Sequence, residues 1–157
     1  MQKISTCLWF NGQAEQAARF YTSIFKNSRI GEISYYGPNT PGTEGSVLTV
    51  AFQIEGQDFM ALNGGPDFQF TPAISFVVDC HSQEEVDTYW ERLLEGGGRP
   101  DQCGWLVDRF GVSWQIVPSV LNELLRDPDG EKANRVMQAM LQMVKLDIAE
   151  LQRASEG

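Results

Sequence analysis

The chain has 157 residues, 42% of them hydrophobic, and carries a formal net charge of −9. Its length and apolar content are those of one compact domain or two small fused modules, and they exclude a disordered chain. The acidic balance, without any basic stripe, argues against nucleic acid as a partner.

The first part of the chain predicts a strand, a helix and three more strands. The apolar run 4–10 indicates a strand, and Asn11 is placed to cap the helix that follows. In that helix, apolar residues recur at helical spacing over 14–25. Three further strands are predicted at 28–36, 46–54 and 57–63.

The same order then recurs. A strand is predicted at 74–79, and Ser82 with Glu85 forms a capping box that opens a helix. The glycines at 96–98 end this helix. The strands that complete the second copy are predicted as a very short one near Arg99, then 104–109 and 112–117.

A third segment has no counterpart in the first copy. Pro118 and Ser119 open a short helix that runs to Leu125. Asp127 and Pro128 then predict the start of a long helix, because proline is favoured at a first helical position. Its apolar stripe, within 133–151, must cover something, and the alternatives are its own sheet or a second subunit.

These patterns divide the chain into three segments within one compact domain. The segments are a first βαβββ module at 1–66, a second at 67–118 and a C-terminal helical extension at 119–157.

Cysteine usage bears on the compartment. Cys7, Cys80 and Cys103 form no spaced motif, and an odd number fits a reducing compartment better than a disulfide framework. No apolar stretch reaches transmembrane length, and the N-terminus lacks a basic-then-apolar signal. We therefore expect a cytoplasmic protein with no membrane partner.

Two βαβββ modules in tandem resemble the vicinal-oxygen-chelate superfamily, which includes glyoxalase I, extradiol dioxygenases and bleomycin-resistance proteins. The likeness sharpens to the PhnB-like branch in sequence blocks that span nearly the whole chain up to Pro118. These blocks are 8–12, 17–21, 60–66, 72–76 and the run Asp-Arg-Phe-Gly-Val-Ser-Trp-Gln at 108–115. The resemblance implies an α+β fold in which tandem βαβββ modules form a curved mixed sheet, with C-terminal helices added.

Members of this branch often carry the label of demethylubiquinone methyltransferases. A methyl donor such as S-adenosylmethionine usually sits on a glycine-rich turn between a strand and the next helix. Here the glycines at 64–65 precede Pro66, and those at 96–98 follow a helix instead of opening one. We interpret both as turns and expect no cofactor.

By the same resemblance, the superfamily's usual chemistry needs a divalent metal held by His, Glu or Gln on the first and last strands of each module. At or near those strands this sequence offers Cys7, Asp58, Ala73 and Gln115. The single histidine, His81, precedes a helix cap. We expect the usual metal site to be absent, the alternative being a weak ion assisted by Gln115 with Asn63.

Aromatic and amide side chains are what the predicted sheet offers instead. The residues expected to bind a ligand in its cup are Cys7, Trp9, Asn63, Trp105, Trp114 and Gln115. Further candidates for its walls are Tyr36, Phe59 and Phe76. Such a lining suits a flat aromatic or amphipathic molecule. Core filling is the competing role for each ring, because the strand faces are not fixed by the sequence.

Three functions follow as hypotheses. One is a small-molecule-binding protein of the bleomycin-resistance type, with a groove shared by two subunits. Another is an enzyme of unknown reaction, in which Asn63, Gln115 or an arginine stabilises an oxyanion or enolate. The third is the labelled methyl transfer. We also expect a homodimer, because a βαβββ pair leaves sheet edges that a twofold partner can close.

Overall fold

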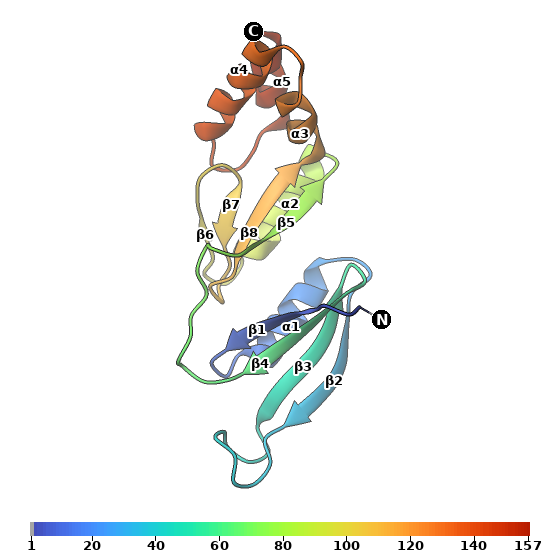
Figure 1. Cartoon of the computed structure of the whole chain (residues 1–157), viewed down its shortest axis with the longest axis vertical. Helices are drawn as coiled ribbons and strands as arrows, with labels where there is room; N and C mark the ends of the chain where they lie inside the picture. The colour runs from blue at the N-terminus through green and yellow to red at the C-terminus, as the bar shows by residue number, and fades with distance from the viewer. Residues whose placement is uncertain (1) are drawn as a thin grey trace. The chain divides into compact units, whose positions relative to one another are not determined.

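The computed structural model describes residues 2–157 and divides into two compact units, one ending at Phe70 and the other beginning at Thr71 (Figure 1). Each unit contains one βαβββ module, and the helical extension belongs to the second unit. The predicted α+β class with tandem modules is therefore confirmed. None of the helices formed by residues 2–157 has the length and apolarity needed to span a bilayer.

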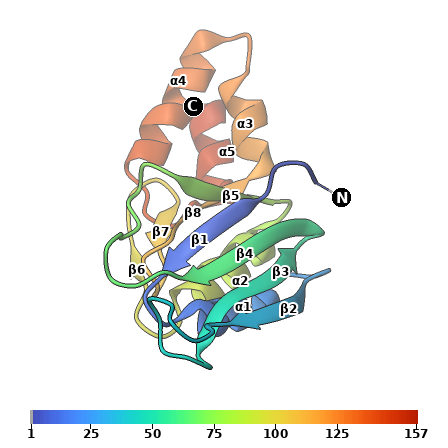
Figure 2. The same ribbon diagram turned by 60° about the horizontal axis from the view of Figure 1, so that its bottom comes forward.

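The first module builds a four-stranded sheet with one helix on it (Figure 2). Its elements are β1 Thr6–Phe10, α1 Ala14–Ile24, β2 Arg29–Tyr35, β3 Val47–Ile54 and β4 Gln57–Asn63. The strand order is β1-β4-β3-β2, in which β1 and β4 are parallel and the other pairs antiparallel. This sheet is mixed, as the family resemblance implies.

One face of this sheet is sealed by α1. The helix buries Tyr21 completely, and the Tyr21 ring stacks on Phe52 of β3 at a centroid distance of 6.3 Å. Phe52 in turn stacks on Phe59 of β4 at 5.3 Å. Because side chains alternate along a strand, these rings fix which residues face α1 and which face away from it. Burying each ring contributes about 1.5–3 kcal/mol.

The start of α1 corrects one expectation. Asn11 does not cap the helix: the cap position is Gln13, whose side chain makes no capping hydrogen bond. Instead the Asn63 Oδ1 atom, at the end of β4, accepts a hydrogen bond of 2.9 Å from the Ala14 amide. The cap comes from a residue far along the chain, which a local pattern cannot reveal.

The second module repeats the arrangement. Its elements are β5 Ser75–Cys80, α2 Gln83–Leu94, β6 Arg99–Pro100, β7 Trp105–Val107 and β8 Ser113–Pro118, in the sheet order β5-β8-β7-β6. The capping box is confirmed, since the Ser82 hydroxyl accepts the Glu85 amide at 3.1 Å. The Glu85 carboxylate reaches back to the His81 amide at 2.6 Å.

The helical extension contains three helices and corrects the prediction of one long helix. They are α3 Ser119–Leu125, α4 Gly130–Leu141 and α5 Ile148–Glu156. The cap of α4 is Asp129, not Asp127, and Asp147 caps the separate helix α5. The helix is interrupted between α4 and α5 because the side chains of Met143 and Leu146, in the connection, join a buried cluster.

The apolar stripe of the extension is buried in this cluster. It unites side chains from all three helices and the α4–α5 connection, namely Leu121, Val136, Met143, Leu146 and Leu151. Val117 of β8 packs against it. The backbone amide of Gly104 also donates to the Val144 carbonyl at 2.7 Å. The extension therefore packs on its own module, while Met137 and Leu141 stay partly exposed.

Candidate functional site

The first sheet has an open face opposite α1, defined here by Cys7, Trp9, Met60 and Leu62. Strand register pairs Cys7 with Met60 and Trp9 with Leu62, so all four side chains share one face. Cys7 is exposed, and Met60 is 41% exposed although it is a large apolar residue. This face presents an indole, a thiol and a thioether side by side.

Trp9 is held in place by the end of β4. Its indole nitrogen donates a hydrogen bond of 2.9 Å to the Gly65 carbonyl, and its ring meets Phe68 edge-on at 4.9 Å. A Cβ atom at Gly64 would lie 2.4 Å from the indole ring. The glycines at 64–65 therefore form the seat of Trp9, because a side chain at Gly64 would displace the ring.

Asn63 is committed to the fold of the same module. Besides accepting the Ala14 amide, its side chain donates to the Val47 carbonyl at 3.1 Å. The Tyr36 hydroxyl donates to the Asn63 backbone carbonyl. The amide thus joins α1, β3 and β4, and a contact with a ligand stays a prediction for this residue.

The second sheet has an open face of its own, defined here by Val77, Trp105, Ser113 and Gln115. Gln115 lies between Val77 and Trp105 in the strand register, so the three share a face. Its amide donates to the Ser75 hydroxyl at 2.9 Å. Val77 is 61% exposed. Trp105 and Gln115, both predicted to bind a ligand, are therefore neighbours in the structure.

Ser113 is a candidate that the sequence reasoning missed. It lies on the same face as Gln115, two residues away, and is only 2% exposed. Its hydroxyl makes no hydrogen bond within residues 2–157. A buried hydroxyl without a partner is unusual in proteins. Strand alternation around Gln115 is the signal that would have found it.

Trp114 lies on the opposite, buried face. It is 4% exposed and packs against Phe76 at a ring distance of 5.2 Å. Its indole nitrogen donates a hydrogen bond of 2.9 Å to Asp108. The structure therefore places Trp114, which was predicted to line a cup, in the buried core of its sheet. Phe59 and Phe76 likewise lie on the buried faces of their sheets, with Phe52 and with Trp114.

The thiols of Cys7 and Cys80 are poorly suited to nucleophilic chemistry. Partial burial raises the pKa of the Cys7 thiol above its usual value. Burial raises the pKa of Cys80 to about 12, and the nearby acids Glu85 and Asp79 add to the shift. Raised pKa values disfavour the reactive thiolate.

A metal of the kind the superfamily uses does not fit the donor set. Within residues 2–157, no three His, Cys, Asp or Glu side chains come close enough to hold an ion. His81 contacts the Ser119 hydroxyl through Nδ1 at 3.1 Å instead of facing other donors. The amides of Asn63 and Gln115 already hydrogen-bond to protein groups. No catalytic step can be derived through a metal at these residues.

Comparison with known proteins supplies a family. Residues 2–117 match the model of the family described as 3-demethylubiquinone-9 3-methyltransferase. A solved PhnB protein from Bacillus cereus, described by the same methyltransferase label, is 42% identical. The match covers 75% of this chain and 100% of that one, with a TM-score of 0.68. No match was found among curated proteins.

Two more distant structures show the fold alone. The PA1353 protein of Pseudomonas aeruginosa is 19% identical, covers 75% of this chain and 98% of its own, and has a TM-score of 0.61. The fosfomycin resistance protein FosX of Listeria monocytogenes, solved with Mn(II) and sulfate, is 18% identical. It covers 80% of this chain and 98% of its own, with a TM-score of 0.55.

Proposed function

The chain belongs to the family described as 3-demethylubiquinone-9 3-methyltransferase, a PhnB-like branch of the vicinal-oxygen-chelate superfamily, and from this premise we propose a binding function. The protein is a cytoplasmic homodimer that binds a small, flat, aromatic molecule without the superfamily's usual metal. The open faces of its two sheets carry the binding residues.

The observation that carries this proposal is apolar and aromatic surface on both open faces. Trp9 and Met60 lie on one, and Trp105 and Val77 on the other. Apolar area removed from water stabilises a complex by about 25 cal/mol per Å². A flat ring placed on either face would cover such area.

The donor set supports binding over metal chemistry. Metal sites are built from converging imidazole, thiolate or carboxylate groups. The residues that define the open faces offer amide, indole, thioether and hydroxyl groups, and the Cys7 thiol stands among them without an imidazole or carboxylate beside it that would complete a metal-binding group within residues 2–157. These groups recognise a neutral ring with polar substituents.

Methyl transfer is the second candidate, and the shared description of the family model and the Bacillus cereus protein favours it. Its weakness is the donor site. The glycines at 64–65 seat the Trp9 ring, and those at 96–98 follow α2. Neither run opens a helix, which is where a nucleotide-like donor usually binds.

Open sheet edges support the homodimer. β1 is an edge strand of the first sheet and β5 an edge strand of the second. Large apolar residues are exposed at or next to both, with Ile4 at 84% and Ile74 at 76%. Edges of this kind invite pairing with another chain. The three free cysteines are in keeping with a reducing cytoplasm.

The test is thermal unfolding of protein that has been treated with a chelator and dialysed. Divalent ions, S-adenosylmethionine and a panel of substituted phenols and catechols are added separately, because a ligand of the native state raises Tm with its concentration. We expect a saturable rise with at least one aromatic compound and none with ions. Stabilisation by a metal would contradict the proposal, and stabilisation by S-adenosylmethionine would favour the second candidate.

A matched pair of variants locates the site. Met60→Ala removes an open-face methionine that is 41% exposed, and Met137→Ala removes one on α4 that is 36% exposed. We expect the ligand-induced rise in Tm to fall in Met60→Ala and to be unchanged in Met137→Ala. Equal responses in both would show that the ligand binds elsewhere.

A further inference from the structure

The first module contains a pocket that is lined by none of the four residues defining its open face, although it includes Gly64 and Gly65, which contact Trp9. It has a volume of about 580 Å³. It is lined by the turn that precedes α1, the first two turns of α1 itself, the connection between β2 and β3, and the residues at and after the end of β4. This volume is within the range of sites that hold small ligands.

The β2–β3 connection is fixed over this pocket. The Tyr36 amide donates to the Ser46 carbonyl, and the Gly45 amide donates to the Tyr36 carbonyl, each at 2.8 Å. The Tyr36 hydroxyl bonds to the carbonyl of Asn63. Gly42 lies so close to Tyr36 that a Cβ there would be 2.4 Å from the ring. The pocket is therefore formed before any ligand arrives.

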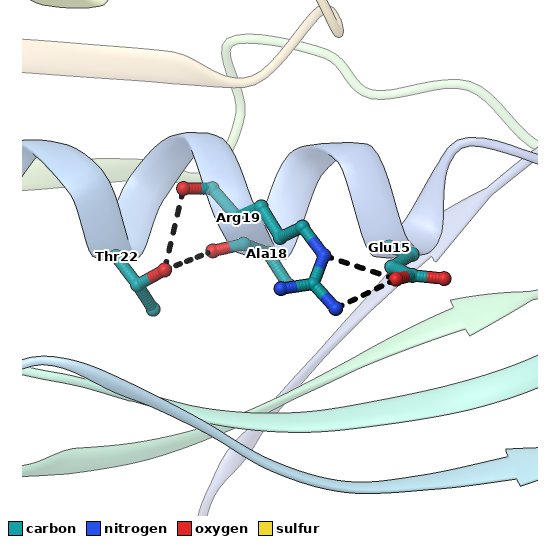
Figure 3. A network of polar contacts seen from close by, with 4 residues as sticks. All are labelled: Glu15, Ala18, Arg19 and Thr22. Atoms are coloured by element: carbon teal, nitrogen blue, oxygen red, sulfur yellow. Dashed lines mark hydrogen bonds and ion pairs between the residues drawn. The ribbon is translucent and has the colours of Figure 1, made fainter.

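The charged side chains that line the pocket carry one negative and one positive charge, so their net charge is zero. Within residues 2–157, the pocket's only charged lining residues are Glu15 and Arg19, one helical turn apart on α1 (Figure 3). Arg19 reaches back along the helix, and its Nε and Nη2 atoms contact the same Glu15 oxygen at 2.9 and 2.8 Å. Oε1 of Glu15 and Nη1 of Arg19 take no part in these bonds and can each accept or donate another.

Uncharged polar groups surround this pair. Asn11 and Gln16, which carry side-chain amides, line the pocket and are exposed. Thr43 of the β2–β3 connection also lines the pocket. Tyr36 is the one aromatic residue that lines the pocket in the part of the chain that the structure describes.

The geometry points to a neutral, polyhydroxylated ligand, a mono- or disaccharide, bound in this pocket. An anion gains little because Glu15 neutralises Arg19. A flat apolar ring would find one aromatic partner among many amides and hydroxyls. Vicinal hydroxyls, in contrast, can donate to the Glu15 carboxylate and accept from the Arg19 guanidinium without breaking the ion pair.

This site is separate from the open faces, so the experiment must resolve position. The full chain is titrated with maltose, inorganic phosphate and glycine betaine while its backbone amide signals are followed by two-dimensional NMR. We expect maltose alone to cause saturable shifts, confined to the residues that line the pocket or adjoin its lining, 11–19, 36–47 and 63–65. Arg19→Ala and Gln16→Ala should each weaken maltose binding, the former roughly tenfold because a charged hydrogen-bonding group is lost.

The control is Arg153→Ala, since Arg153 is also exposed and pairs with a glutamate on its own helix. It should leave the maltose affinity unchanged. Saturable shifts with phosphate or betaine and not with maltose would overturn the assignment, as would unsaturable shifts or shifts confined to Cys7, Trp9 and Met60. None of these results bears on the aromatic response that tests the open faces.

Discussion

The indole nitrogen of Trp114 donates a hydrogen bond of 2.9 Å to the carboxylate of Asp108, and both side chains are buried. The other carboxylate oxygen accepts the amides of Phe110 and Val112 at 2.8 and 3.1 Å. The run 108–115 is one of the sequence blocks that carry the likeness to the family. Its hydrogen bonds to Asp108 stabilise the turn between β7 and β8.

Removing this carboxylate should destabilise the protein. Asp108→Ala leaves the Trp114 indole and two backbone amides without their acceptor, and we expect a loss of about 2–4 kcal/mol in the free energy of unfolding. Denaturant titration measures it. Asp67→Ala, at an exposed aspartate, serves as the control and should change stability little. A loss no greater than that of the control would refute the structural role of Asp108.

A second prediction concerns Gln83 of α2, which ties down the α4–α5 connection. Its amide donates to the Leu146 carbonyl at 3.1 Å and accepts the Ile148 amide at 2.8 Å. Gln83→Ala should cost about 1–2 kcal/mol, because both backbone groups lose a partner.

Hydrogen exchange distinguishes this from a general loss of stability. Amides of α5 should exchange faster in Gln83→Ala, while those of the first sheet keep their native rates. Gln142→Ala, at an exposed glutamine in the same connection, is the control. Unchanged protection of α5 would mean that the extension is held by its apolar cluster alone.

A third prediction is that the free energy of unfolding depends weakly on pH in the acidic range. Hydrogen bonds from Lys145 and Gln83 hold the pKa of Asp87 below its usual value of 3.8. Since the pKa is lowered in the folded state, the stabilisation is complete above that value and is lost as the pH falls through the folded pKa.

The size of this effect should be small, because the Asp87–Lys145 pair, at 2.8 Å, is about half exposed. We expect Asp87→Asn to cost about 0.2–1 kcal/mol near neutral pH and nothing measurable in strong acid. Parallel unfolding curves across the pH range check this. A cost that grew toward low pH would have the wrong sign.

A fourth prediction concerns the order of cysteine modification. Cys7 is exposed, whereas Cys80 is buried and its pKa is raised to about 12. Iodoacetamide should therefore modify Cys7 in the native protein and spare Cys80 until the chain unfolds. Because the pKa of Cys7 is also raised, its rate should still be climbing at alkaline pH. Early modification of Cys80 would contradict the buried position assigned to it.

The sequence predicted the elements of both modules closely because their signals are local. Short apolar runs such as 4–10 marked the strands, and Ser82 with Glu85 marked the start of α2. The break between α4 and α5 was missed because it depends on Met143 and Leu146 joining a cluster with residues of other helices. A continuous apolar stripe does not reveal such a turn.

The candidate site was only partly accessible from the sequence. Trp9, Trp105 and Gln115 lie on open faces as the binding hypothesis requires, but Trp114 lies in the core and Asn63 caps α1. Adjacent strand residues point to opposite faces, so Trp114 and Gln115 could not both line one pocket. The partner of each polar atom, which decides these roles, comes from distant strands and only the fold supplies it.

The most direct test of the open-face proposal uses Cys7 as a reporter, because its thiol lies beside Met60 on that face. Its alkylation is followed by mass spectrometry with and without a saturating amount of the aromatic compound that raises Tm most, and Cys103 serves as the internal reference. We predict that the ligand slows modification of Cys7 and leaves Cys103 unchanged. A compound that raises Tm yet leaves the rate at Cys7 unaltered would contradict binding at the first open face.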